Sequence, residues 1–472
     1  MKNIRVRFAP SPTGPLHIGS IRTAIYNYIF AKKHKGKFIL RIEDTDKYRF
    51  VADIENYIVE AIEWCGLSTD ESHLNIGKYG PYKQSDRKHL YDFYIQKLLE
   101  KGYAYYAFDP IDFKTYNAKT RLQMNNSLSI DTKNLLDKLE LPYVIRFKIP
   151  KYKLIYLNDE IRGEIKINTS SLDDKIIFKS DGNITYHLAN VIDDHLMKIT
   201  HVIRGEEWIS SLPLHILMYE AFEWKIPLFV HLPLLLKTSG GKLSKRDGND
   251  HVIEWKDTKT ISTGYREEGY FPETIVNMLA LLGWNEGKEK ELFCLKKLEK
   301  KFSFKRVQKS GAIFSKEKAF WLNKQYFQRK PIEHLMIIFS KEFNKHGGYI
   351  NNKTLVKVIK TIKNRVSFIQ ELWKKTYYFF IAPQRYDDQY ITIDNISILN
   401  NLQKSLIKEK DFRSFNLRRI IKFFIYDNQL VLKQVFQTLR IALVGTLKGG
   451  DIFFIMEILG KKETIKRIRR FY

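Results

Sequence analysis

The sequence predicts an α/β fold: a Rossmann-like domain, split by a mixed α/β insertion and followed by an all-α C-terminal region. Three observations predict it. The chain opens on a strand, a loop, a helix and a second strand; a central stretch alternates with the period of strands; and the last two hundred residues have helical periodicity. With 472 residues the chain exceeds the ~250–300 residues that one hydrophobic core can organise, so several domains are expected.

The opening segment predicts a βαβ unit. Ile4–Phe8 is typical of a short strand, the Pro- and Gly-rich segment 9–15 cannot be helical, and isoleucines recur every fourth residue over Ile21–Ile29. A second strand, Phe38–Ile42, ends in the polar run Glu43–Asp46. Polar residues at the carboxyl ends of parallel strands lie where open α/β sheets bind ligands.

Two helices are expected next, Asp53–Cys65 with Asp53 as its N-cap, and Asp86–Lys101 ended by Gly102. The alternating runs Tyr143–Lys148 and Gly163–Asn168 then predict strands of the insertion.

After the insertion, the parallel α/β pattern is expected to resume. It predicts a strand at Lys175–Phe178, a turn at 180–183, a helix near Tyr186–Met197 and a strand at Ile199–Arg204.

Beyond Pro272 helical periodicity dominates, over Pro331–Phe343, Lys353–Lys374 and Leu417–Phe436. The segment 461–470 contains six basic residues and one acidic residue. We therefore predict a helical, basic C-terminal region.

The formal net charge is +27, from 80 Lys and Arg against 53 Asp and Glu, which favours a polyanionic partner such as nucleic acid. An AT-rich genome would also raise the lysine count, so charge alone leaves that alternative open. Cys65 and Cys294 stand far apart and match no metal-ligand spacing, so neither a disulfide framework nor a zinc site is expected. Without a signal peptide at the N-terminus or an apolar run long enough to span a bilayer, we expect a cytoplasmic protein that binds no membrane.

Two short motifs can carry nucleotide chemistry. His17-Ile18-Gly19 lies where a loop meets a helix N-terminus, so the imidazole and nearby N–H groups can face phosphates. Lys242 and Lys245 stand three apart in a Gly-rich loop, which suits them to hold pyrophosphate as it leaves. Alone, the first matches many ordinary turns and the second many solvated basic loops. In this order, separated by an α/β domain, they are far more specific.

Longer motifs carry a family resemblance over essentially the whole chain. Segments 7–20 (RFAPSPTGPLHIGS), 41–46 (RIEDTD), 180–197 (SDGNITYHLANVIDDHLM) and 242–246 (KLSKR) resemble bacterial glutamyl-tRNA synthetases. The resemblance implies a class I aminoacyl-tRNA synthetase, in which HIGS and KLSKR correspond to the HIGH and KMSKS motifs. Ser20 and Leu243 are familiar variants in the glutamyl branch.

The resemblance implies roles for individual residues. His17, Lys242 and Lys245 would be catalytic, and the ATP site would consist of His17, Gly19, Lys242, Ser244 and Lys245. Glutamate, with two carboxylates and an ammonium, needs fixed cations and an acceptor. Its site would consist of Arg7, Ala9, Ser11, Glu43, Tyr186, Asn190 and Arg204. Arg7 with Tyr186 would hold the side-chain carboxylate, and Arg204 the α-carboxylate. Arg365 falls where the family reads the anticodon, although basic helical faces are usually only solvated.

The implied reaction attaches L-glutamate to tRNA(Glu) through a glutamyl-adenylate, with ATP as substrate, Mg²⁺ on the phosphates and no protein nucleophile. The resemblance also implies a monomer and activation that waits for tRNA. Whether tRNA(Gln) is charged too stays open.

The implied domains are catalytic halves at 1–107 and 180–250, an acceptor-end-binding insertion at 108–179, a stem-contact segment at 251–325 and a helical anticodon-binding region at 326–472. The predicted helix near Tyr186–Met197 carries further polar residues. They are expected to cap the helix and to form interdomain hydrogen bonds rather than to bind metal: His187, Asp193, Asp194 and His195. Trp208, Trp224 and Trp284 are expected in the core.

Four alternatives stay open. A glutaminyl-tRNA synthetase would share the core but carry a β-rich anticodon region and a different loop before His17. A truncated paralogue that modifies a tRNA base would lack the C-terminal helices. A nucleotidyltransferase with only the His-x-Gly motif would not need KLSKR or some two hundred further residues. A catalytically dead tRNA-binding protein would keep the basic helices, but here both nucleotide motifs are intact.

Overall fold

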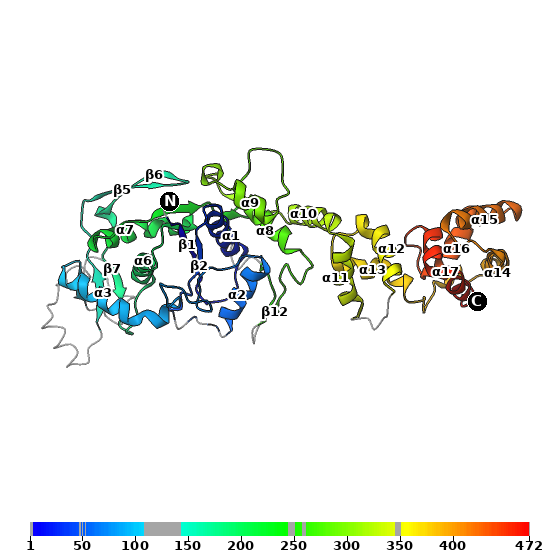
Figure 1. The fold of residues 1–472 in the computed structure, drawn as a ribbon, viewed down its shortest axis with the longest axis horizontal. Coiled ribbons are helices and arrows are strands. Elements are labelled where there is room, and N and C mark those ends of the chain that lie inside the picture. Colours follow the sequence, from blue (N-terminus) through cyan, green and yellow to red (C-terminus); the bar gives the residue numbers. More distant parts are fainter. Residues whose placement is uncertain are drawn as a thin grey trace. The chain divides into compact units, whose positions relative to one another are not determined.

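A computed structural model describes residues 3–46, 49, 51, 53–107, 143–243, 251–256, 261–344 and 351–471. The chain forms two compact units, Met1–Ala319 and Phe320–Tyr472 (Figure 1). In the described part no helix is long and apolar enough to cross a membrane.

Parallel strand pairs form the centre of the first unit. β1 (Arg5–Phe8) pairs in parallel with β2 (Lys37–Leu40), and β8 (His201–Gly205) pairs in parallel with β9 (Leu228–Leu232). Hydrogen bonds between Arg5 and Thr200 join the two pairs. The predicted βαβ opening is confirmed, so the carboxyl ends of β1, β2 and β8 provide one edge for a site.

Helices pack around these strands because their apolar residues recur at helical spacing. α1 (Ile18–Lys33) buries Ile21, Ile25 and Ile29, as predicted. α6 (Tyr186–Leu196) and α7 (Leu212–Ala221) pack on each other, and both contribute to a hydrophobic core with β8 and β9. The remaining helices of this region are α2 (Ile54–Trp64) and α3 (Lys88–Glu100).

Asp53 precedes α2, as expected of an N-cap, but its side chain makes no capping hydrogen bond and its φ is 60°. The N-cap position is therefore confirmed, but the carboxylate does not cap the helix, because a side-chain cap normally requires the extended backbone that Asp53 lacks.

The insertion contains an antiparallel sheet and a hairpin. β3 (Ala104–Ala107), β4 (Val144–Phe147) and β7 (Lys175–Phe178) form a sheet in the order β3-β4-β7, while β5 (Leu154–Asp159) and β6 (Gly163–Asn168) pair as a hairpin. The prediction that β7 resumes the parallel core is wrong. Its alternating run pairs antiparallel with β4, and periodicity alone does not specify a partner.

The first unit continues through short strands and helices to α10. These elements are β10 (Leu235–Leu236), β11 (Trp255–Lys256), β12 (Ile261–Ser262), α8 (Pro272–Leu281), α9 (Leu295–Lys301), β13 (Ala312–Ile313) and α10 (Lys316–Arg329). β10 pairs in parallel with β13.

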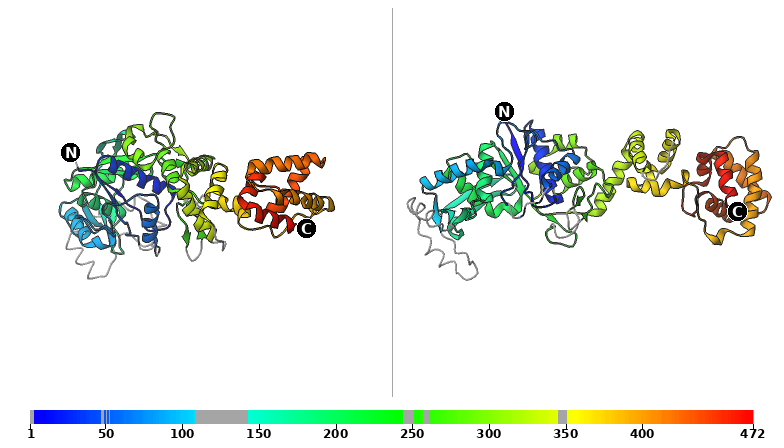
Figure 2. Two further views of the ribbon diagram at one scale, coloured as in Figure 1. Left: turned by 45° about the vertical axis from the view of Figure 1, so that its right-hand side comes forward. Right: turned by 90° about the horizontal axis from the view of Figure 1, so that it is seen from below.

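Among its described residues the second unit contains helices joined by loops and no strand, as predicted (Figure 2). Its further helices are α11 (Ile332–Asn344), α12 (Asn352–Ile362), α13 (Ile369–Thr376), α14 (Ile393–Lys408), α15 (Ser414–Asp427), α16 (Leu432–Val444) and α17 (Ile452–Arg469). The helices α14 to α17 share one apolar core.

Two of the predicted helical segments are each divided. The segment 353–374 contains α12 and α13 with a break between them, and 417–436 contains parts of α15 and α16. In the second break Gln429 has a φ of 53°. The sequence does not show either break, because the helices on both sides bury apolar residues and the helical spacing of those residues therefore continues across it.

Candidate active site

A cavity of about 320 Å³ lies at the carboxyl ends of β1 and β8, beside the start of α1 and the N-terminal end of α6. Seven residues that the sequence predicted for glutamate line it together: Arg7, Ala9, Ser11, Glu43, Tyr186, Asn190 and Arg204. Gly19, predicted for ATP, lines it as well. The cavity therefore offers cations, a carboxylate and small polar groups within one space.

Arg7, at the end of β1, is held by a buried carboxylate. Its Nε and Nη2 donate to Asp194 at 3.0 and 3.2 Å, and Arg41 Nη1 donates to the same carboxylate at 2.7 Å. Although burial raises the pKa of Asp194, the two guanidinium groups outweigh it and hold that pKa below its ordinary value. Nη1 of Arg7 makes no hydrogen bond within the described part of the chain, so it is available to the cavity.

Glu43 presents the one carboxylate that the sequence predicted for the site. Its Oε1 accepts from Arg41 Nη2 at 2.9 Å and from Asn190 Nδ2 at 3.0 Å. Burial raises the pKa of Glu43 against the opposing pull of Arg41 and Arg7. A carboxylate held in this way can accept from an ammonium group.

Arg204, at the end of β8, is 4% exposed and has no carboxylate partner among the described residues. Its Nε donates to His231 Nε2 at 3.1 Å, its Nη1 lies 3.3 Å from His215 Nδ1, and its Nη2 donates to the Trp208 carbonyl at 3.2 Å. An arginine stays protonated even when buried, so Arg204 brings to the cavity a positive charge that no carboxylate of the described residues pairs with directly.

Tyr186 and Trp208 form an aromatic wall, with ring centroids 4.6 Å apart. Burial raises the pKa of Tyr186 to about 12, so its hydroxyl stays protonated and can donate to an anion. The expectation that Trp208 lies in the core is wrong, because it is only half-buried and lines the cavity. Trp284 is buried as expected, and Trp224 is partly buried against the core.

His17 precedes α1 and caps it, since its Nδ1 accepts from the Gly19 backbone N–H at 3.1 Å. A Cβ at position 19 would lie 3.3 Å from that nitrogen, which favours glycine there. His17 does not line the cavity, and neither does Lys242, which is exposed after the turn Gly240-Gly241. Ser244 and Lys245 lie outside the described residues.

The polar residues of α6 do form hydrogen bonds, but they neither cap the helix nor join domains. Asp193 accepts from Arg87 Nε at 2.6 Å, and Asp194 from Arg7 and Arg41, all within the first unit. His187 bonds to His215, and His195 stacks on Trp224 at 3.8 Å. Among the described residues no group of three or more His, Cys, Asp or Glu side chains is placed to hold a metal ion.

Sequence reasoning missed several residues of the cavity. Asp194, which does not line the cavity but holds Arg7, could have been found, because it follows Tyr186 and Asn190 at intervals of four on α6 and so shares their face. Residues that line the cavity without a prior prediction include Thr13, Thr23, Gly205, Glu207 and Trp208.

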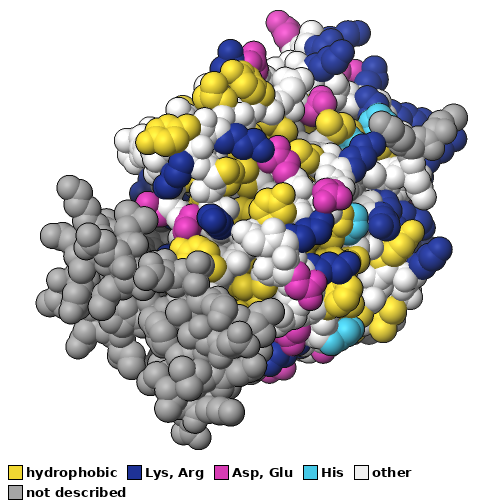
Figure 3. All heavy atoms as spheres, turned by 90° about the vertical axis from the view of Figure 1, so that its left-hand side faces the viewer, with side chains coloured by type: hydrophobic (Ala, Val, Ile, Leu, Met, Phe, Trp, Pro, Cys, Tyr) yellow, Lys and Arg dark blue, Asp and Glu magenta, His cyan; other side chains and the backbone are white. Residues whose placement is uncertain are grey.

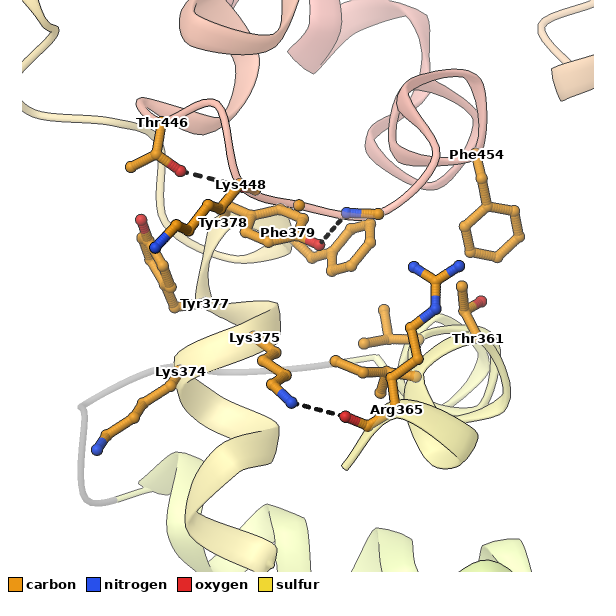
Figure 4. A pocket seen from close by; sticks show the side chains of 14 residues that line it. Thr361, Arg365, Lys374, Lys375, Tyr377, Tyr378, Phe379, Thr446, Lys448 and Phe454 are labelled. Atoms are coloured by element: carbon orange, nitrogen blue, oxygen red, sulfur yellow. Dashed lines mark hydrogen bonds between the residues drawn. The ribbon is translucent and has the colours of Figure 1, made fainter. Parts of the chain in front are cut away.

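A second cavity, of about 470 Å³, lies in the helical unit around Arg365 (Figure 4). Lys375 Nζ donates to the Arg365 carbonyl at 2.6 Å, and the Arg365 guanidinium points toward Thr361 and Phe454. Basic and aromatic side chains from distant segments meet here: Arg365, Lys374, Lys375, Tyr377, Tyr378, Phe379, Lys448 and Phe454. Such a mixture suits a nucleotide, through charge and stacking.

One end of the first unit shows how its charge is spread. On the described part of the face in Figure 3, Lys and Arg side chains lie among acidic and hydrophobic ones. This face alone therefore does not explain the net charge of +27.

Two family patterns match the chain. Residues 3–321 match the catalytic domain of class I tRNA synthetases (E and Q), and residues 330–472 match an anticodon binding domain.

Similar proteins match over their whole lengths. The chain is 48% identical to a glutamate–tRNA ligase of Christiangramia forsetii, covering 99% of this chain and 98% of the relative. It is 46% identical to a glutamate–tRNA ligase of Flavobacterium johnsoniae, covering 99% of each. The crystal structure of a glutamate–tRNA ligase from Elizabethkingia meningosepticum, in complex with its amino acid, matches with a TM-score of 0.92 at 42% identity, covering 100% of this chain and 99% of that one.

Proposed function

This chain belongs to the class I tRNA synthetases for glutamate and glutamine, and from that premise we propose that it attaches L-glutamate to tRNA(Glu), forming glutamyl-tRNA, AMP and diphosphate for protein synthesis. The observation that carries the choice of glutamate is the shared cavity of Arg7, Arg204, Glu43, Tyr186 and Asn190. These five residues bring two guanidinium groups and one buried carboxylate, which is the complement of two carboxylates and one ammonium; the other carboxylate of the lining, Glu207, is exposed.

Each polar group of the cavity has a proposed partner on the substrate. Arg7 and the Tyr186 hydroxyl hold the side-chain carboxylate, and Arg204 holds the α-carboxylate. Glu43, with Ser11 and Asn190, binds the remaining polar groups, while Ala9 leaves room beside them. These contacts fix the α-carboxylate for attack on the α-phosphorus of ATP, and catalysis comes largely from positioning.

The phosphates of ATP are proposed to lie against the start of α1, at His17 and Gly19, where helix N–H groups favour anions. Lys242, Ser244 and Lys245 hold the phosphates that leave. Mg²⁺ is usually bound through phosphates rather than by a protein cage, and when bound it offsets their developing charge. In the second step the terminal hydroxyl of tRNA attacks the acyl carbon, and AMP leaves.

The proposed domains divide this work. The catalytic halves are 1–107 and 180–250, the insertion 108–179 grips the acceptor end, 251–325 contacts the stem, and 326–472 binds the anticodon. Arg365 is proposed to read an anticodon base, which the basic and aromatic lining of its cavity supports. We further propose a cytoplasmic monomer that binds no membrane and needs no zinc.

Aminoacylation tests the proposal directly. Purified tRNA(Glu) and tRNA(Gln) are incubated separately with the protein, ATP, Mg²⁺ and either labelled glutamate or labelled glutamine. Glutamate transfer to tRNA(Glu) alone is expected of a discriminating enzyme, and transfer to both tRNAs of a non-discriminating one. Transfer of glutamine, or no transfer by well-folded protein, would overturn the proposal.

A further inference from the structure

Two buried histidines, His215 and His231, contact Arg204. Behind them lie the half-buried His187 and the buried Asp159, and the hydrogen bonds of the group fix its protonation. Asp159, the last residue of β5, is 2% exposed, and its Oδ2 lies 2.8 Å from His231 Nδ1. Burial raises the pKa of Asp159, but hydrogen bonds from His231 and from the Arg162 and Ile161 backbones hold it below its ordinary value. An ionised carboxylate only accepts, so His231 Nδ1 carries the hydrogen.

The other nitrogen of His231 must then accept. Arg204 Nε can only donate, and it lies 3.1 Å from His231 Nε2. His231 is therefore neutral, with its hydrogen on Nδ1. Protonating Nε2 would remove the acceptor and place a second positive charge against the guanidinium.

Hydrogen bonds fix the protonation of His215 and His187 in the same way. Arg204 Nη1 donates to His215 Nδ1 at 3.3 Å, so the hydrogen of His215 is on Nε2, which lies 3.1 Å from His187 Nδ1. His187 Nδ1 accepts and is neutral too. Burial and the charge of Arg204 lower the pKa of His187 to about 4, which agrees with this assignment.

Neutral acceptors hold Arg204 without offsetting its charge. A carboxylate in the place of either ring would fix the guanidinium equally well but would form a closed ion pair. Arg7 shows that alternative, because Asp194 occupies its Nε and Nη2. The choice of histidine leaves the positive charge of Arg204 for the ligand.

We propose that His231 and His215 are positioning residues for the α-carboxylate of the amino acid: as neutral acceptors they orient Arg204 and leave its charge unpaired, and Asp159 fixes the tautomer of His231. This inference rests on the proposed function. It also joins the insertion to the amino-acid site, because Asp159 belongs to the β5–β6 hairpin and Glu160 donates its backbone N–H to the Phe229 carbonyl of β9 at 3.1 Å.

The test compares ligands with and without an α-carboxylate. KM for glutamate and ATP is measured in aminoacylation, together with the inhibition constant of L-glutamol adenylate, in which a CH₂ group replaces the α-carboxyl carbon. His231→Leu removes the acceptor at similar volume. His231→Gln keeps one, because the glutamine carbonyl reaches about as far as Nε2. His195→Gln is the matched control, since His195 lies on α6 and stacks on Trp224 instead of bonding to Arg204.

Losing a hydrogen bond to a charged group predicts that His231→Leu raises the glutamate KM about 10- to 100-fold. The inhibition constant of L-glutamol adenylate and the KM for ATP should change less than about twofold. His231→Gln should restore most of the glutamate KM, and His195→Gln should leave all three constants unchanged.

A purely structural role predicts other results. Equal losses for glutamate and for L-glutamol adenylate would overturn the inference, as would an unchanged glutamate KM in His231→Leu or a Gln variant as impaired as the Leu variant. If His231→Leu does not fold, His215→Leu and His215→Asn form the same pair, because the asparagine carbonyl replaces Nδ1. Failure of the wild type to charge glutamate would refute the proposed function instead.

Discussion

Replacing Asp194 by asparagine should destabilise the unit formed by residues 1–319 by about 3–5 kcal/mol, the usual cost of removing one partner from a buried ion pair. The side chain is 2% exposed and accepts from Arg7 and from Arg41. Asparagine keeps the shape, but it removes the negative charge and turns one acceptor into an N–H donor that faces guanidinium N–H groups. Both cations are then left buried with one anion fewer.

Urea unfolding followed by tryptophan fluorescence measures this cost. At an m-value of about 3 kcal/mol/M, the upper end for small proteins, 3–5 kcal/mol lowers the midpoint of the first unit by about 1–1.7 M. Asp46→Asn is the control, because Asp46 pairs with Arg49 at the surface, where 73% of the arginine side chain is exposed. That variant should unfold at nearly the wild-type midpoint.

The difference between wild type and Asp194→Asn should also depend on pH. The folded-state pKa of Asp194 lies below its value of about 3.9 in the unfolded chain, so its stabilisation is complete above that unfolded pKa. It is lost as pH falls through the folded-state pKa, where the two proteins should converge. A midpoint shift below about 0.3 M at pH 7, or a difference that persists in strong acid, would refute the reasoning.

Three further changes test the proposed site. Arg7→Ala should raise the KM for glutamate about 10- to 100-fold and that for ATP much less, because a charged hydrogen bond to the amino acid is lost; equal changes in steady-state assays would count against the role. Lys245→Ala should slow glutamate activation about 100- to 1,000-fold in a single-turnover assay while tRNA affinity is unchanged, and normal turnover would remove Lys245 from the site. Arg365→Ala should raise the KM for tRNA but not for glutamate, whereas Arg413→Ala, whose guanidinium pairs with Asp411 outside the cavity, should change neither.

The sequence predicted which segments form the helices and strands of the site better than it predicted which strands pair with each other. β1 was predicted because an alternating run ends at a Pro- and Gly-rich loop, and α1 and α6 because a helical period follows a loop or a turn. β7 was predicted as a strand but assigned to the wrong sheet, since pairing depends on contacts far along the chain. The helical spacing of apolar residues likewise continues across breaks such as the one at Gln429. There the backbone leaves the helical conformation, with a φ of 53°, and the side-chain pattern does not show it.

For the site, resemblance supplied the residues that line the cavity but not those that orient them. Asp159, His215 and His231 are more than 10 residues from Arg204 in the sequence, and they come from the insertion hairpin, α7 and β9. Their role depends on which ring nitrogen of each histidine accepts a hydrogen bond from Arg204, and only a three-dimensional structure gives that information. Trp208 was expected in the core because tryptophan is usually well buried, but here one face is open to the cavity.

The two arginines of the cavity suggest how glutamate would be preferred to glutamine. Arg204 forms no ion pair with a carboxylate of the described residues, whereas Arg7 shares Asp194 with Arg41 and keeps Nη1 for the ligand. A glutamine amide would bring no negative charge to Arg7, and only its carbonyl oxygen could accept from Nη1, so it would lose up to about 1.5–3 kcal/mol of charged hydrogen bonding. That loss corresponds to about 10- to 100-fold in kcat/KM, and the preference should shrink in Arg7→Ala but persist in His231→Leu, whose defect concerns the α-carboxylate that both amino acids possess. Measuring kcat/KM for glutamate and for glutamine in Arg7→Ala and in His231→Leu distinguishes the role of Arg7 from that of Arg204. If the preference for glutamate disappears in both variants, the two arginines do not act on different carboxylates.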